Sequence, residues 1–352
     1  ALYANTTGAS NTAVGSLALD ANTTASDCTA VGTNALSTNT VGQSNTAVGT
    51  SALQANLNGT RNTAVGRTAL QTNTSGSDNT SMGYFAMYKN TSGQLNTAVG
   101  KDALEENTTG ANNTALGYKA LEANTTASNN TAVGTNSLLS NTTGNGHTAV
   151  GQDSGLSVTT SVNNVLIGKQ AGQSGVLLTT GSSNTIVGSF AHTTAAGTAD
   201  GQVFGYNVAG EGGFTTVGFG SSDIRAANGT ATWATVSDQR YKKDIVDSTT
   251  GLSFINALQP RTFKYKTLGE LPETFRAYEA DSTEVFKNAN TNHGFIAQEI
   301  KAAIDADSSI KDGFRLWDDR DDGSQEVAEA ALIPILVKAI QELTARIETL
   351  EG

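Results

Sequence analysis

The chain has 352 residues, and only 15% of them are charged, against roughly 25% in an average globular domain. Its formal net charge of −11 argues against binding to nucleic acid or to an anionic membrane surface, because both attract basic faces. A single cysteine, Cys28, excludes an intrachain disulfide, and the sequence has no apolar run long enough to predict membrane insertion.

A fixed period of 17 residues organises the first half of the chain. A small apolar tripeptide that ends in glycine, such as Ala13-Val14-Gly15, recurs at nine consecutive intervals of 17 residues and then at less regular spacing. Ten glycines mark these intervals: Gly15, Gly32, Gly49, Gly66, Gly83, Gly100, Gly117, Gly134, Gly151 and Gly168. An array of this kind predicts a solenoid or a fibre. Residue 1 falls inside a repeat, so we expect the sequence to be part of a longer protein.

Each repeat combines a short strand, an apolar pair and a turn. The Asn-Thr-Ala-Val-Gly segment at residues 11–15 predicts a strand that ends at a glycine turn. The pair Ala18-Leu19 follows, and an Asn-Thr-Thr turn segment begins at Asn22. Asn and Gly suit such turns because they tolerate positive φ. Cys28 stands where other repeats carry Asn, which indicates a tolerated substitution.

Residues 1–195 are therefore predicted to form a parallel β-roll or β-solenoid, within a mainly β chain. One unit has too few apolar side chains to fold alone, whereas stacked copies place Val on Val and Leu on Leu in a narrow core. Asn and Thr at fixed turn positions can form hydrogen-bonded ladders along the stack. The narrow stack leaves apolar surface exposed, and three copies around an axis would bury it, so we expect a homotrimer.

These repeats resemble those of tail-fibre proteins from phages and phage-like particles. The resemblance covers roughly residues 1–195. They are more loosely similar to the Gly-punctuated repeats of trimeric autotransporter adhesins, which form parallel β-rolls with a shorter period. The first resemblance implies a structural fibre on a virion, and the second implies a bacterial surface adhesin.

Aromatic residues interrupt the small polar residues of the array. They are compatible with a sugar-binding surface, and equally with variable surface positions that carry no function. The residues are Tyr3, Tyr84, Phe85, Tyr88 and Tyr118. Glu105 and Glu106 lie in a variable turn, and a glycosidase pair cannot be argued from them. A glycan-degrading tailspike is therefore the least favoured function.

The composition changes after residue 195. Residues 196–236 are Gly-rich and only partly periodic, which indicates a neck between two domains. From Ser237 the charge density rises and the glycine period ends. We predict a small α+β domain over residues 237–352, which is long enough for a modest core.

Four ordered blocks of this domain resemble the endosialidase-type C-terminal intramolecular chaperone, an auto-cleaving serine peptidase family. Residues 237–245 match its opening motif Ser-Asp-x-Arg-x-Lys-x-x-Ile at every fixed position. Residues 258–265 resemble its first strand block, residues 293–299 its central signature, and residues 332–343 its terminal helix. The resemblance implies a domain that assembles a trimer and is then released by its own cut.

The resemblance also implies the chemistry of that cut. Ser237 is the nucleophile, Lys242 is its base, and the chain is severed between Val236 and Ser237. A serine hydroxyl needs a base to become a good nucleophile, and a lysine amine five residues away is close enough to fold back across one turn. Asp238 and Arg240 match the motif and have possible supporting roles.

His293 and Gln298 belong to the central block. They either face the site or support the core of the domain. No motif predicts a metal site or a cofactor.

The last helix carries an apolar seam at alternating spacings of three and four residues. Its members are Ile333, Leu336, Ile340, Leu343, Ile347 and Leu350. This spacing is typical of a coiled coil, here the trimer seam, although alternating Ile and Leu usually favours two strands. The alternative is a helix that packs on its own domain.

Together these patterns predict a homotrimeric tail fibre that binds a host-cell receptor or glycan. We expect the fibre to be assembled in the host cytoplasm and to be extracellular when mature. The alternative is a bacterial trimeric surface adhesin with the same self-cleaving chaperone. We expect no nucleic-acid partner, no membrane insertion and no cofactor for this chain, and an export signal and membrane anchor in a preceding segment would favour the adhesin.

Overall fold

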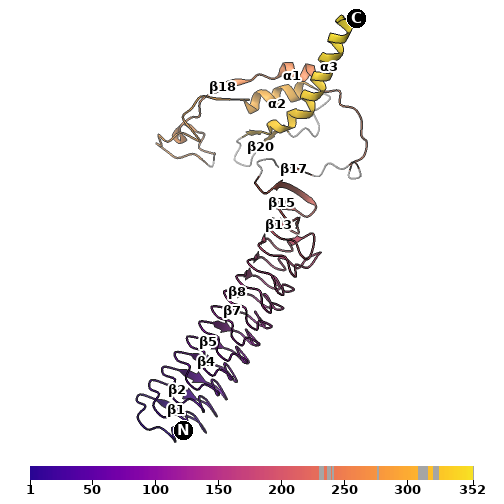
Figure 1. Cartoon of the computed structure of the whole chain (residues 1–352). Coiled ribbons are helices and arrows are strands. Elements are labelled where there is room, and N and C mark those ends of the chain that lie inside the picture. Colours follow the sequence, from indigo (N-terminus) through magenta and orange to yellow (C-terminus); the bar gives the residue numbers. More distant parts are fainter. Residues whose placement is uncertain are drawn as a thin grey trace. The chain divides into compact units, whose positions relative to one another are not determined.

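The computed structural model describes residues 1–229, 234–235, 239, 242–275, 277–307, 316–319 and 325–351 (Figure 1). The chain divides into two compact units, Ala1–Ser237 and Asp238–Gly352. The first unit is a parallel β-solenoid, as the repeats predict, and the second is a small α+β domain that ends in a long helix. None of the helices among the described residues combines the length and apolarity needed to cross a membrane.

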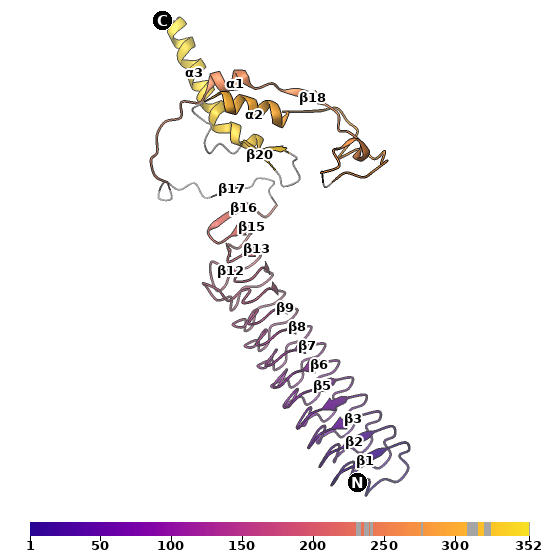
Figure 2. The ribbon, with the colours of Figure 1, turned by 180° about the vertical axis from the view of Figure 1, so that it is seen from behind.

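The solenoid is a stack of coils, and each regular coil contributes one three-residue strand. Figure 2 shows these coils following one another along the stack. The regular strands are β1 (Thr12–Val14), β2 (Thr29–Val31), β3 (Thr46–Val48), β4 (Thr63–Val65), β5 (Thr80–Met82), β6 (Thr97–Val99), β7 (Thr114–Leu116), β8 (Thr131–Val133), β9 (Thr148–Val150), β10 (Val165–Ile167) and β11 (Thr185–Val187). Neighbours pair in parallel with equivalent residues opposite each other, as Thr63 is opposite Thr80.

The parallel stack continues beyond residue 195 and ends in antiparallel strands. Strands β13 (Gln202–Tyr206) and β15 (Phe214–Phe219) extend the parallel sheet. Strand β16 (Ser222–Ala227) then pairs antiparallel with β15, and β17 (Ala234–Thr235) pairs antiparallel with β16. A separate two-stranded parallel sheet contains β12 (His192–Thr193) and β14 (Ala209–Gly210).

The core of the solenoid is built from small side chains. The central residue of every strand from β2 to β11 is fully buried. It is Ala in most of them, such as Ala64, and Ser81, Leu166 or Ile186 in the others. The Ala-Leu pair, such as Ala69 and Leu70, is also fully buried. Successive Leu side chains therefore stack inside, as the sequence predicts.

The expectation that Val joins this core is wrong. Val residues of successive strands do stack in register, but their side chains lie on the outer face, where Val48 is 36% exposed and Leu116 is 46% exposed. The reason is the alternation of a strand, which sends the first and third residues to the face opposite the second. The central residue of each strand, such as Ala47, therefore faces the core while Thr46 and Val48 face outwards.

Glycine marks the end of each strand because the next coil lies against it. Gly66 has φ of +137°, and a Cβ added there would lie 2.5 Å from the carbonyl oxygen of Gly83. Gly83 stands in the same relation to Gly100. Any side chain at this position would push adjacent coils apart, which explains the 17-residue recurrence.

Two columns of buried Asn run along the stack, as the predicted ladders require. In the turn column, Asn90 Nδ2 donates to Asn73 Oδ1 at 2.9 Å and to the carbonyl of Gly93 at 3.1 Å. Asn90 Oδ1 in turn accepts a hydrogen bond from Asn107 Nδ2 at 2.8 Å. Asn90 thus hydrogen-bonds within its own coil and to the coils on both sides.

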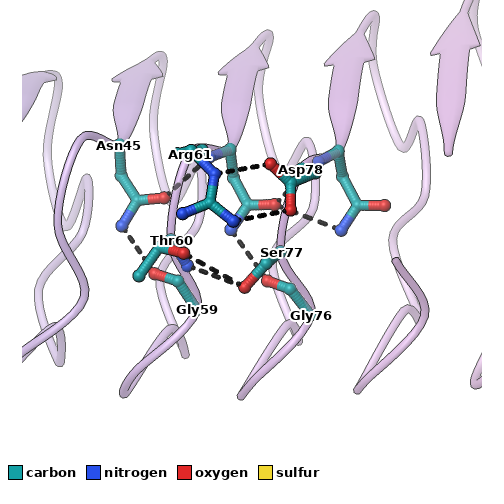
Figure 3. A network of polar contacts seen from close by, with 9 residues as sticks. Asn45, Gly59, Thr60, Arg61, Gly76, Ser77 and Asp78 are labelled. Carbon is teal, nitrogen blue, oxygen red and sulfur yellow. Dashed lines mark hydrogen bonds and ion pairs between the residues drawn. The ribbon is translucent and has the colours of Figure 1, made fainter. Parts of the chain in front are cut away.

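The second column precedes the strands and is shown in Figure 3. Asn45 Nδ2 donates to the carbonyl of Gly59 at 2.7 Å, while Asn45 Oδ1 accepts from the backbone N–H of Asn62 at 2.9 Å. On the nearby surface, Arg61 and Asp78 form a two-pronged ion pair between adjacent coils, with Nε 2.6 Å from Oδ1. Side chains therefore hydrogen-bond between coils alongside the backbone.

His147 takes the place of Asn in the second column. Its Nδ1 accepts a hydrogen bond from the backbone N–H of Asn164 at 3.2 Å, and its Nε2 lies 2.9 Å from the carbonyl of Ser161. A neutral imidazole that carries its proton on Nε2 satisfies both contacts. Burial lowers the pKa of His147 from 6.5 to about 4. Cys28 occupies the same column, and burial raises the pKa of its thiol.

The second unit has helices on a few short strands. Its elements are α1 (Leu252–Ala257), β18 (Arg261–Phe263), η2 (Leu268–Glu270), β19 (Asn292–Gly294), α2 (Ala297–Ala306), β20 (Trp317–Asp319), β21 (Gln325–Val327), η3 (Glu329–Leu332) and α3 (Ile333–Glu351). Its core joins Phe254 of α1, Ile300 and Ile304 of α2, and Ile335 of α3. Glu342 of α3 also accepts the backbone N–H of Leu252 at 2.9 Å.

We predict that Asn90→Ala lowers the free energy of unfolding by about 2–4 kcal/mol, because buried partners on two neighbouring coils lose their hydrogen bonds. The measurement is urea denaturation of the full chain. Asn58→Ala is the control, because Asn58 is an exposed turn residue and its loss should change stability little. Equal effects of the two substitutions would contradict the structural role of the ladder.

We predict that His147 makes the solenoid acid-sensitive. Its folded pKa lies below its ordinary value, so the unfolded chain binds the proton more readily. The resulting stability is complete above pH 6.5 and is lost as the pH falls towards 4, by about 3 kcal/mol in total. His147→Asn, which restores the residue of the sibling coils, should flatten this part of the stability profile. Identical profiles between pH 6.5 and 4 would contradict the assignment.

Candidate functional site

Much of the predicted cleavage motif lies outside the described residues. This applies to Val236, Ser237, Asp238 and Arg240. Lys242 is described: it is exposed, and its backbone N–H donates to the carbonyl of Gln239 at 3.0 Å. The pairing of Ser237 with Lys242 stays a prediction.

The next two sequence blocks come together in space. Strand β18 of the first block pairs antiparallel with β19 of the central block, and Thr262 lies opposite His293. Arg261 donates two hydrogen bonds to Glu299 of α2 from one edge of its guanidinium, with Nε 3.0 Å from Oε2 and Nη2 2.7 Å from Oε1. The Arg261 guanidinium lowers the pKa of Glu299, and Glu299 raises that of Arg261.

Sequence reasoning missed the ion pair of Arg261 and Glu299. The two residues are 38 positions apart in the sequence. The sequence hints at the pair only in that each residue belongs to a block that resembles the family. A bidentate pair fixes direction as well as distance. It therefore sets the orientation of α2 relative to the β18–β19 pair.

His293 and Gln298 lie close together along the chain but on different elements. His293 is exposed on β19, and Gln298 is exposed on the first turn of α2. Neither side chain contributes to the hydrophobic core described for this unit. Their surfaces are accessible for a site role, which stays a prediction.

Helix α3 has one face inside its own domain and another in solvent. Ile335 and Ala339 are buried in the domain. All members of the predicted seam are exposed in the single chain, from Leu336 at 42% to Leu350 at 86%. The helix therefore packs on its own domain through Ile335 and Ala339, as the alternative expects, and the role of the exposed seam in a trimer stays a prediction.

Comparison with known protein families assigns part of the second unit. Residues 237–307 match the peptidase family model described as the chaperone of endosialidase. Over these residues the chain is similar to that family. The match begins at Ser237 and includes the opening motif and the blocks at 258–265 and 293–299.

The family supports a self-cleaving peptidase domain in general terms. Together with the β-solenoid, it fits a tail fibre that carries an endosialidase-type chaperone. The comparison with curated proteins gave no match. The comparison with solved structures gave none either.

Proposed function

We propose that the chain is a subunit of a homotrimeric, receptor-binding tail fibre whose chaperone domain aligns three copies and then cuts itself free between Val236 and Ser237. The fibre is assembled in the host cytoplasm and carried on the virion. The observation that carries the proposal is the family match, which begins at the predicted nucleophile and directly follows the solenoid unit.

The solenoid explains why an aligning domain is needed. Successive coils are nearly identical, and equivalent residues pair at every step, as in Thr29 opposite Thr46 and Thr46 opposite Thr63. Two chains displaced by one coil would present almost the same surfaces to each other. A non-repetitive domain that trimerises first removes this ambiguity, because it has a single correct arrangement.

Two exposed apolar surfaces support the trimer. The outer face of strands β1–β11 carries Thr, Val and other apolar residues at its first and third positions, and none of these positions holds a charged residue. Met82 and Leu116 of this face are 43% and 46% exposed. The seam of α3 is the second surface. Rows of exposed, uncharged Thr and apolar side chains on successive coils are suited to packing against another copy of the chain.

The proposed cut is an attack of the Ser237 hydroxyl on the carbonyl carbon of Val236. The neutral amine of Lys242 accepts the hydroxyl proton, and the amide bond breaks as its nitrogen leaves with a proton. The resulting ester is hydrolysed by water, which leaves a carboxylate on Val236. Lys242 is exposed in the single chain, and burial favours a neutral lysine. Contact with neighbouring copies would therefore link cleavage to assembly.

We predict that the purified chain separates into residues 1–236 and 237–352, and that Ser237→Ala and Lys242→Met both remain intact while still forming trimers. Mass spectrometry of the denatured protein locates the cut, and native mass spectrometry gives the oligomer. Lys243→Met is the matched control and should still be cut. Cleavage of Ser237→Ala at the same bond, or loss of its trimer, would refute the proposal.

We predict that the double variant Met82→Lys with Leu116→Lys forms a weaker trimer, because the interface would bury unpaired charges. The concentration below which its trimer dissociates should rise at least roughly tenfold relative to the parent. Sedimentation velocity at serial dilutions measures this. Thr109→Lys, at an exposed turn position, is the control and should behave like the parent. A parent chain that sediments as a monomer rules out the trimer, and an unchanged double variant rules out this face.

A further inference from the structure

Aromatic and charged residues concentrate on a few coils in the middle of the solenoid. Residues 1–195 contain six aromatic residues and fourteen charged residues, of which four and seven lie between positions 84 and 122. Within residues 1–195, the repeat position of Tyr84 and Tyr118 holds no aromatic residue on the other coils: it is Ser or Thr on several of them, and residues such as Arg67, Gln152 or Lys169 on others. Variation on one face of a repeat scaffold is typical of a binding surface.

The 17-residue coil places these residues in columns. Tyr84, Lys101 and Tyr118 follow one another on successive coils, and the backbone N–H of Asp102 donates to the carbonyl of Tyr84 at 3.0 Å. Glu105 and Glu122 stack in the same way. We call the surface at positions 84–89, 101–106 and 118–122 the aromatic corner. It spans three consecutive coils of the stack.

The rings of the aromatic corner are both ordered and exposed. Tyr84 and Phe85 have centroids 4.1 Å apart, and Phe85 and Tyr88 have centroids 4.9 Å apart. Lys101 Nζ lies 5.4 Å from the centroid of the Tyr118 ring. Even so, Tyr84 remains 36% exposed and Tyr118 remains 42% exposed. Arg67 Cζ also lies 5.6 Å from the Tyr84 centroid, and Lys119 Nζ lies 5.6 Å from the Tyr118 centroid. The corner therefore presents ring surface to solvent between flanking cationic side chains.

The charges of the corner are largely paired with one another. Lys119 Nζ lies 3.0 Å from Glu122 Oε1, and Lys101 Nζ lies 3.4 Å from Asp102 Oδ2. Carboxylate oxygens of Asp102, Glu105 and Glu122 lie within 4.8 Å of one another. Burial and these like charges raise the pKa of Glu105. The corner offers many hydrogen-bonding groups, but its clustered carboxylates oppose an anionic ligand.

We propose that the aromatic corner binds a linear, uncharged polysaccharide. Pyranose rings have an apolar C–H face that stacks on aromatic rings, and hydroxyls that hydrogen-bond to carboxylates and ammonium groups. Tyr84 and Tyr118 are two coils apart, about 10 Å along the stack, which is close to the length of two linked pyranose rings. Sugar units laid along the stack would meet one exposed ring at every second unit.

This inference rests on the proposed receptor-binding role and names the chemical class of the receptor. The test uses the full chain on an array of purified bacterial surface polysaccharides, both neutral and anionic. Tyr84→Thr with Tyr118→Thr removes the rings and installs the residue that sibling coils carry. Tyr3→Ala is the matched control, because Tyr3 is an exposed aromatic residue outside the corner.

We expect the parent chain and the Tyr3→Ala control to bind neutral polysaccharides, and the double variant to bind about tenfold more weakly or less. Binding confined to anionic glycans, equal binding by the double variant, or binding to no glycan would overturn the inference. Trimer formation and cleavage are measured on the same samples. If both hold while glycan binding fails, the fibre assignment stands and only this inference falls.

Discussion

Hydrogen bonding between equivalent positions of successive coils is the constraint on which the solenoid depends. The backbone and the buried Asn side chains both obey it, as Asn90 does with Asn73 and Asn107. It permits a thin core made of Ala and Leu, because hydrogen bonds of the backbone and of the Asn side chains add stability that a thicker core would otherwise provide. It also requires glycine at strand ends, where Gly66 touches the backbone of Gly83.

The same regularity creates a problem of register between chains, which the second unit solves in the proposed function. Because successive coils are nearly identical, two chains displaced by one coil would make almost the same contacts. The repeats alone therefore do not select one register between chains. The chaperone segment is different in kind: its elements are held by single, non-repeated contacts, such as Arg261 with Glu299 and Glu342 with the backbone of Leu252. A domain of that kind has one arrangement, which is what the proposed function requires of a segment that sets a common register for the repeats.

The sequence predicted the period, the solenoid, the Asn ladders and the chaperone family, because each is written as a repeat or an ordered motif. It misplaced Val, since strict alternation allows either Ala or the Thr and Val pair to face inwards. It also missed the grouping of Asp102, Glu105 and Glu122, because residues 17 apart become neighbours only once the coil is known. The cleavage pair stays a sequence prediction, since Ser237 lies outside the described residues.

The most direct test of this account is electron cryomicroscopy of the uncut Ser237→Ala chain. The account predicts particles of three solenoids whose equivalent coils lie at the same height, with a rise of about 4.8 Å per coil. Rods of a single chain would contradict it. So would three chains offset from one another by whole coils, because the second unit would then have failed to set the register.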